Sequence, residues 1–280
     1  MATDLGIAAH DVIVDGLRIH YVQAGSGPPV VLVHGIAASA VDWHLNIAAL
    51  ADHFTVTAMD LPGFGESEIP TTPMAMIDAV RFLDGFLPAL KIEAAALVGN
   101  SMGGLICAHY AIARPNRVRR LVLVDPAGMA RDLSIHFRLL TIPALGRRFL
   151  KPNPNAGALA ARGLFADPAR APALWMADKV RDRGPRAQRH MLHALRSGAS
   201  IFGLRRELIM LDRLRMLDIP SLIMWGAHDH VVPPWHLQLV RQRFPSARTY
   251  LFSNAGHVPM LECPEEFNRV TINFLLGVGC

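Results

Sequence analysis

Three residues whose types could together perform nucleophilic hydrolysis stand in three separate loops of this chain. Ser101 lies in the stretch GNSMGG, directly after the apolar run AAALV. Asp229 follows the run SLIMWG, and His257 comes five residues after the run RTYLF. A serine hydroxyl becomes a nucleophile when an imidazole takes its proton, and a carboxylate orients that imidazole. The sequence therefore predicts Ser101 as nucleophile, His257 as base and Asp229 as acid.

The glycines around Ser101 favour a sharp turn between a strand and a helix. Gly99, Gly103 and Gly104 have no side chain to obstruct such a turn, which leaves the serine hydroxyl exposed at the end of the strand. Acyl transfer through this serine also requires two backbone N–H groups directed at the developing oxyanion. We expect one from Met102, directly after the nucleophile, and the other from Ile36 in the stretch HGIAAS.

Alternating strand and helix patterns are expected to position these loops. The later β-branched runs are apolar throughout, which is typical of strands covered on both faces. Their alternation with helical patterns indicates a mostly parallel sheet, whose carboxyl ends carry the three residues. The expected strands are 11–14, 18–23, 30–34, 55–60, 95–99, 121–125, 221–226 and 248–252, and the expected helices are 43–51, 74–90, 103–113, 234–244 and 264–276.

Residues 129–215 show no strand pattern and differ from the remainder in charge. They contain 17 basic and 6 acidic residues, a net charge of +11, whereas the remainder has 11 basic and 17 acidic residues, a net charge of −6. Their arginines alternate with apolar residues, as in LRRELIMLDRLRML, which favours solvated faces of amphipathic helices over a nucleic-acid surface. A surface that attracts anionic substrates is the alternative. We interpret 129–215 as a helical cap inserted into a core of residues 1–128 and 216–280.

Five segments give the chain a resemblance to the α/β-hydrolase superfamily. HGIAAS, DLPGFGES, GNSMGG, WGAHD and GHVPMLE occur in the family's order and at its spacing. The resemblance implies an α/β-hydrolase fold: a mostly parallel eight-stranded sheet flanked by helices, with an inserted helical cap. It also implies a triad of Ser101, His257 and Asp229, with oxyanion amides at Ile36 and Met102. Hydrolysis by such a triad needs no cofactor and no metal. The serine at position 101 distinguishes the chain from haloalkane dehalogenases and epoxide hydrolases, which have an aspartate nucleophile there.

Two kinds of hydrolysis fit this resemblance. GNSMGG is similar to the corresponding segment of carbon–carbon bond hydrolases that cleave ring-fission products of aromatic degradation. That subgroup usually has tryptophan after the base and an HGSGPG-like oxyanion loop, whereas here Val258 follows His257 and the loop reads HGIAAS. The subgroup also has a lid arginine that binds a substrate carboxylate. The valine after His257 and the different oxyanion loop favour carboxylic esters of small to medium acyl chains over a dioxo acid. The candidates for a lid arginine are Arg181, Arg183, Arg186 and Arg189.

Two further alternatives stay open. Asp125 ends the expected strand 121–125, next to the strand that leads to Asp229, and could replace Asp229 as the acid. A hydrolase-fold protein that binds a ligand with little turnover would keep the same residues, because a fold does not fix a function.

Composition indicates the setting in which this chemistry would occur. Hydrophobic residues make up 51% of the chain and charged residues 18%, which predicts a sizeable core rather than disorder. No apolar stretch reaches the roughly 18 residues of a membrane span, and the first residues lack a secretory signal pattern. The three cysteines show no CxxC spacing and are expected to be reduced thiols. We therefore expect a cytoplasmic enzyme acting on a small-molecule ester, with no nucleic-acid partner and with self-association left open.

Overall fold

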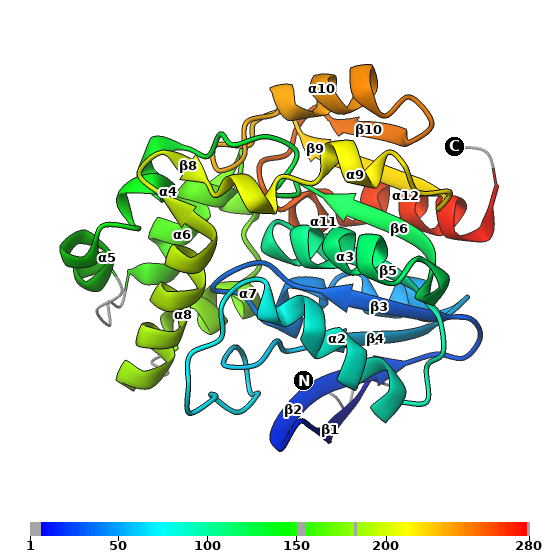
Figure 1. Cartoon of the computed structure of the whole chain (residues 1–280), viewed down its shortest axis with the longest axis horizontal. Helices are drawn as coiled ribbons and strands as arrows, with labels where there is room; N and C mark the ends of the chain where they lie inside the picture. The colour runs from blue at the N-terminus through cyan, green and yellow to red at the C-terminus, as the bar shows by residue number, and fades with distance from the viewer. Residues whose placement is uncertain (1–6, 150–154, 182–183, 279–280) are drawn as a thin grey trace.

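Eight strands form one sheet in the computed structural model, which describes residues 7–149, 155–181 and 184–278 (Figure 1). The strand order is β1-β2-β4-β3-β5-β6-β9-β10. β2 pairs antiparallel with β1 and with β4, whereas all other neighbours in the sheet pair parallel. The prediction of a mostly parallel eight-stranded sheet flanked by helices is confirmed. The strands are β1 (Ala8–Val14), β2 (Leu17–Ala24), β3 (Pro29–Val33), β4 (Thr55–Met59), β5 (Ala95–Asn100), β6 (Val118–Val124), β9 (Ser221–Gly226) and β10 (Arg248–Phe252).

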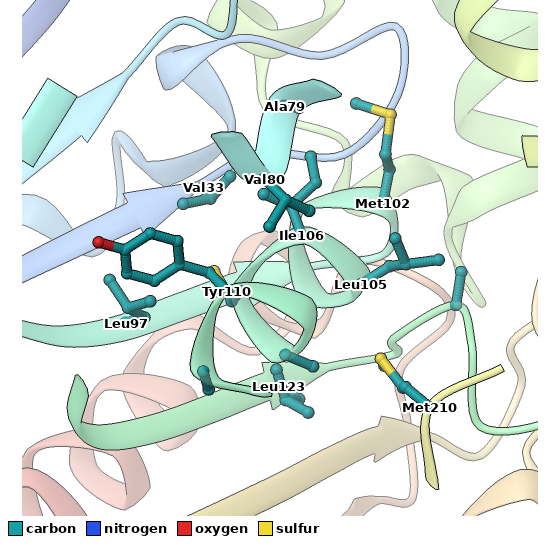
Figure 2. Packing of buried hydrophobic residues seen from close by; sticks show 14 of the residues in the cluster. Val33, Ala79, Val80, Leu97, Met102, Leu105, Ile106, Tyr110, Leu123 and Met210 are labelled. Atoms are coloured by element: carbon teal, nitrogen blue, oxygen red, sulfur yellow. The ribbon is translucent and has the colours of Figure 1, made fainter. Parts of the chain in front are cut away.

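Side chains of the parallel strands alternate between two apolar layers. Leu97 and Leu123 lie in the layer formed with α2 (Asp78–Ala89), α3 (Met102–Ala113) and α10 (Trp235–Arg243), and Figure 2 shows both leucines packed around α3. Val98 and Val122, one position away on the same strands, lie in the opposite layer with α1 (Ile47–Ala51) and α12 (Pro264–Leu276). Successive side chains of a strand point to opposite faces. Because both faces are covered, every residue of β5 is buried, which explains the apolar run from Ala95 to Val98.

The expected helix 43–51 is divided in the structure. A 3₁₀ turn, η1 (Ala40–Trp43), precedes the short helix α1. Asn46 lies between them, and its side-chain amide donates to Met260 O at 3.0 Å and to Asn268 Oδ1 at 2.9 Å. Bonds to a distant segment therefore fix the chain at the point where local periodicity predicted continuous helix.

Two other elements also differ from the expectation. α2 begins at Asp78, four residues after the expected start, where the Asp78 carboxylate accepts the Ala75 N–H at 2.9 Å. Residues 199–204, where no strand was expected, form a small antiparallel hairpin of β7 (Ala199–Ser200) and β8 (Gly203–Leu204). Gly203 has a φ of +96°, a conformation that glycine adopts readily and that closes the hairpin.

The segment between β6 and β9, here called the insertion, is mostly helical. Its helices α4 to α8 lie together at one end of the sheet (Figure 1). None of the helices in the described part of the chain has the length and apolar character needed to cross a membrane. The division into a core and a cap at residues 129 and 215 stays a prediction. Besides β7 and β8, the insertion contains α4 (Ile135–Leu139), α5 (Pro143–Phe149), α6 (Ala156–Leu164), η3 (Pro168–Arg170), α7 (Ala173–Val180), α8 (Gly184–Gly198), η4 (Arg206–Leu208) and α9 (Leu211–Leu214).

Several arginines of the insertion bind its own backbone carbonyl groups. Arg131 donates to Leu204 O at 3.3 Å, Arg196 donates to Thr141 O at 3.0 Å, and Arg205 donates to Arg196 O at 3.1 Å. Part of the positive charge of this segment therefore stabilises loops and helix ends.

Candidate active site

Ser101 occupies a strained turn between β5 and α3. Its φ and ψ are 55° and −116°, outside the regions that non-glycine residues usually adopt. Two backbone hydrogen bonds hold the turn: Ser101 N–H donates to Val124 O at 2.9 Å, and Ala127 N–H donates to Ser101 O at 3.2 Å. The residue is only 7% exposed. This strand–turn–helix geometry is the one that a nucleophile elbow requires.

Two glycines allow the turn to form. A Cβ atom at Gly99 would lie 2.4 Å from Gly103 O, and one at Gly103 would lie 2.1 Å from Val33 O. Both distances are far shorter than van der Waals contacts. Helix α3 can therefore approach β3 and β5 this closely only because these positions carry no side chain.

His257 and Asp229 meet at the carboxyl ends of β10 and β9. Nδ1 of His257 lies 2.7 Å from Oδ2 of Asp229. The other carboxylate oxygen, Oδ1, accepts N–H groups from Val231 at 2.7 Å and from Val232 at 3.0 Å. Each of the two side chains belongs to a residue that is 4% exposed. Three hydrogen bonds therefore fix one orientation of the carboxylate toward the imidazole.

Asn100 connects the serine turn to the histidine loop. Its Nδ2 donates to His257 O at 3.1 Å and to Val124 O at 3.2 Å. Since Ser101 follows directly, the expected nucleophile and base belong to segments in contact. Within the described part of the chain no hydrogen bond joins the Ser101 hydroxyl to His257. Hydrogen bonds of this kind often tighten only when substrate is bound.

The two amides expected at an oxyanion hole flank Ser101. Met102 is the first residue of α3, so its N–H has no acceptor within the helix. Gly35 lies against the serine, because a Cβ atom there would be 3.3 Å from Ser101 Cβ. Ile36 is the next residue. Both amides are therefore carried by segments that lie close to the serine.

Two buried side chains hold the loop that contains Ile36. His34 donates from Nδ1 to Gly35 O at 2.7 Å and accepts the Leu61 N–H at Nε2 at 3.0 Å. Asp60 accepts the Ala40 N–H at 2.7 Å. Because both ring nitrogens of His34 are engaged with the backbone, this histidine shapes the loop.

A second carboxyl group lies beside the His257–Asp229 pair. Asp125 is fully buried, and its Oδ1 accepts the Gly226 N–H at 2.8 Å. One potential metal-ligand atom from each of Asp125, Asp229 and His257 lies within 4.8 Å of the others, and no other such group occurs among the described residues. The hydrogen bond between Asp229 and His257 explains why these two side chains lie close together, with no need for an ion between them. That the site works without a metal stays a prediction.

Two small cavities adjoin the expected oxyanion amides. One of about 20 Å³ is lined by Met102 and His190, among others. The other has about 90 Å³ and is lined by the apolar residues Ile36, Ala37, Phe137, Leu140, Gly146, Met191, Leu192 and Leu195. A larger cavity of about 540 Å³ lies between β1, β2, η1 and α7, and none of the five expected site residues lines it. Size alone therefore does not indicate where a substrate binds.

The described candidates for a lid arginine lie at the surface. Arg181 pairs with Glu66, Arg186 donates to Ile69 O at 3.2 Å, and Arg189 is exposed. Arg183 lies outside the described residues. None of the three described arginines is therefore buried beside Ser101.

Glu262 holds the histidine loop and the insertion together, and the sequence did not single it out. The residue is 5% exposed. Its carboxylate accepts the N–H of Gly256, next to His257, at 2.8 Å, and those of Ala166 and Asp167 in the insertion at 3.1 Å and 2.7 Å. An acidic residue directly after the apolar pair Met260–Leu261 was the available signal, because a carboxylate in an apolar setting needs donors.

Lys179 of α7 is a second residue that contacts a loop of the site and that the sequence did not single out. Its Nζ donates to Ala37 O at 3.1 Å and lies 3.3 Å from Asp42 Oδ1. Ala37 directly follows Ile36, so this cation reaches the loop of the expected oxyanion amide. The local sequence carries no signal for this contact, because its partners lie far away along the chain.

The fold is that of an α/β hydrolase. A family model described as alpha/beta hydrolase fold matches residues 28–264, and the chain belongs to that family.

Relatives within the family differ in activity. The chain is 32% identical to the dihydrolipoyllysine-residue acetyltransferase component of an acetoin cleaving system from Cupriavidus necator, over 94% of this chain and 68% of that protein. It is 31% identical to the pimeloyl-[acyl-carrier protein] methyl ester esterase of Aeromonas hydrophila, over 92% of this chain and 100% of that protein. It is 30% identical to the 2-hydroxy-6-oxo-6-phenylhexa-2,4-dienoate hydrolase of Comamonas testosteroni, over 92% and 91%. Relatives therefore include an ester hydrolase and a carbon–carbon bond hydrolase, which leaves the substrate class unresolved.

Proposed function

We propose that this chain is a serine hydrolase that cleaves carboxylic esters of small to medium acyl chains through an acyl-enzyme. The observation that carries the proposal is the 2.7 Å contact between His257 Nδ1 and Asp229 Oδ2, in a loop that Asn100 ties to the strained turn of Ser101. Because Asp229 engages Nδ1, Nε2 of the imidazole is the nitrogen that receives the serine proton.

The proposed reaction proceeds in two stages. Ser101 attacks the ester carbonyl while His257 takes its proton, and the amides of Ile36 and Met102 stabilise the oxyanion. His257 then protonates the leaving alcohol, and Asp229 stabilises the imidazolium formed in between. In the second stage the same imidazole activates water, which releases the acid and regenerates the serine. The chemistry uses no cofactor and no metal.

One feature favours a short acyl group, and two others favour an ester over a dioxo acid. The apolar cavity beside Ile36 has about 90 Å³, less than the roughly 150 Å³ cavity that holds a benzene molecule in an engineered protein. The described lid arginine candidates Arg181 and Arg186 are engaged elsewhere, whereas a dioxo acid substrate would need a cation for its carboxylate. Similarity to a methyl ester esterase also favours an ester substrate over a dioxo acid.

Carbon–carbon bond cleavage remains the second candidate, supported by the 30% identity to a dienoate hydrolase and by the GNSMGG segment. The cytoplasmic location, self-association and the lack of a nucleic-acid partner stay predictions.

The test is steady-state hydrolysis of p-nitrophenyl esters from acetate to long acyl chains, beside a yellow ring-fission dioxo acid. We expect turnover that falls with chain length and no bleaching of the dioxo acid. Ser101→Ala should abolish ester turnover with the fold intact, and Ser246→Ala, at an exposed turn, serves as the matched control. Ester turnover retained by Ser101→Ala would sink the proposal, and rapid bleaching with poor ester turnover would favour the second candidate.

A further inference from the structure

Asp125 is a buried acid for which the proposed reaction has no role. It follows β6 directly, has a φ of 46° and is fully buried. Its carboxyl group lies beside Asp229 and His257, with one oxygen or ring nitrogen of each residue within 4.8 Å of the others. A positive φ is uncommon for residues other than glycine, although aspartate adopts it more often than most.

The hydrogen bonds of the two carboxyl groups are unequal. Both oxygens of Asp229 have donors: Val231 N–H and Val232 N–H for Oδ1, and the His257 imidazole for Oδ2. Within the part of the chain that the structure describes, Asp125 Oδ1 accepts only the Gly226 N–H. Among the described residues, Asp125 Oδ2 has no donor. A buried carboxylate oxygen without a donor is costly, whereas a protonated oxygen beside another carboxylate has an acceptor.

Two adjacent buried carboxyl groups cannot both be ionised. The titratable groups that face Asp125 are Asp229 after β9, His257 after β10, and Glu262 of α11 (Pro259–Glu262). Burial, first, and the charge of Asp229, second, raise the pKa of Asp125 well above its usual range, and Glu262 acts in the same direction. Asp229 has more donors, so the unequal hydrogen bonding places the single proton on Asp125.

We propose that Asp125 is a neutral carboxylic acid at working pH, and that its Oδ2–H donates to the Asp229 carboxylate and positions it for His257. A chain of contacts then runs from the Gly226 N–H through Asp125 and Asp229 to the imidazole. Asp125 is a positioning residue, because it acts on the base only through Asp229. The inference rests on the proposed roles of Asp229 and His257.

Protonation can be measured without any turnover. The infrared difference spectrum of wild type minus Asp125→Asn, recorded near pH 7, should contain the C=O stretch of a protonated carboxylic acid that shifts in D₂O. The same band is expected in a Ser101→Ala background. A difference spectrum that contains only carboxylate bands would overturn the proposal. Because this readout requires no substrate, it decides the state of Asp125 even if the chain hydrolyses no ester.

Kinetics test the positioning role. Asp125→Asn keeps an acceptor for Gly226 and a donor for Asp229, so it should retain most of the wild-type kcat/KM. Asp125→Leu has neither and should lower kcat/KM by roughly ten- to hundredfold. It should also move the acid limb of the pH profile to higher pH, because an Asp229 carboxylate with one donor fewer binds the imidazolium more strongly.

Two kinetic outcomes would contradict the proposal. An unmoved acid limb in Asp125→Leu would mean that Asp125 only supports the fold. A loss in Asp125→Asn as large as the roughly 10⁴-fold loss expected for Asp229→Asn would mean that Asp125 is ionised and acts as the acid itself. The infrared comparison needs only the asparagine variant, so the decision does not depend on the folding of the leucine variant.

Discussion

The strand-end loops of the sheet and the insertion contribute to the candidate site by different kinds of contact. The sheet positions its residues mainly through backbone hydrogen bonds, such as Ser101 N–H to Val124 O, and through the close approach of Gly103 to Val33 O. The insertion meets the same site through one backbone hydrogen bond, from His257 N–H to Leu164 O at 2.7 Å, and through charged side chains. Lys179 reaches Ala37 O, and Glu262 of the sheet side receives N–H groups of the insertion.

Because the contacts differ in kind, some parts of the site are rigid and others depend on single residues. A backbone ladder involves many bonds, so the loss of one side chain changes little. A buried charge has few partners, and removal of one partner leaves another buried and unpaired. The insertion should therefore be sensitive to charge, and the sheet to volume.

Removal of the Lys179 charge is expected to have the largest effect on stability. The Lys179 side chain is 9% exposed and that of Asp42 is 4% exposed. Burial raises the pKa of Asp42, and the ammonium group of Lys179 opposes that rise. Lys179→Met leaves this carboxyl group without its cation, so the free energy of unfolding should fall by about 3 kcal/mol. Urea denaturation measures the change.

The same substitution should also reduce ester turnover, because it releases Ala37 O next to the Ile36 amide. Lys91→Met is the matched control, since Lys91 is exposed. Unfolding free energies that are equal in the two variants, or a stabilised Lys179→Met, would mean that the insertion is held mainly by apolar packing.

A matched pair of glycine substitutions tests sensitivity to volume. Gly103→Ala would put a Cβ atom 2.1 Å from Val33 O, so we expect a loss of about 2 kcal/mol in unfolding free energy and a displaced Met102 amide. Gly163 in α6 is exposed and has no atom within 4 Å of a Cβ atom. Gly163→Ala should therefore stabilise the chain by about 0.5 kcal/mol, the helix-propensity gain.

Thermal and urea unfolding measure whether each variant gains or loses unfolding free energy. Ester turnover shows whether the Met102 amide has been displaced. A Gly103→Ala variant as stable and active as wild type would contradict the idea that close backbone approach holds the serine turn. A destabilised Gly163→Ala would show that α6 is packed more tightly than its surroundings indicate.

The same contrast explains which features of the fold and of the candidate site could be predicted from the sequence. The eight strands and the residues at their carboxyl ends could be found from sequence, because buried runs such as AAALV and glycines such as Gly99 are local signals. Asn46, which interrupts an expected helix, acts through Met260 and Asn268, more than two hundred residues away. Lys179 and Glu262 likewise act on distant partners. Periodicity reports the environment of a segment and carries no information about which remote group that segment will meet.

His236 offers the smallest expected effect and the clearest counterpart to Lys179. It is a fully buried side chain of α10 whose two ring nitrogens have no hydrogen-bond partner among the described residues. Burial lowers its pKa to about 4. Between the ordinary value of 6.5 and 4 the unfolded chain binds more protons, so this histidine contributes stability above pH 6.5 that is lost as the pH falls toward 4.

Replacing His236 by phenylalanine removes that titration. It also removes the two unpaired ring nitrogens at this position. His236→Phe should change the unfolding free energy at pH 7 by less than about 1 kcal/mol. At pH 5 the variant should be more stable than wild type. The reason is that proton binding by His236 stabilises the unfolded wild-type chain at that pH, and phenylalanine binds no proton. Other buried histidines, such as His190, have pKa values lowered in the same direction, so the quantity to compare is the difference between variant and wild type at each pH. A difference that does not change between pH 7 and pH 5 would mean that the folded and unfolded chains bind the His236 proton equally, so that burial does not disfavour the charged imidazole.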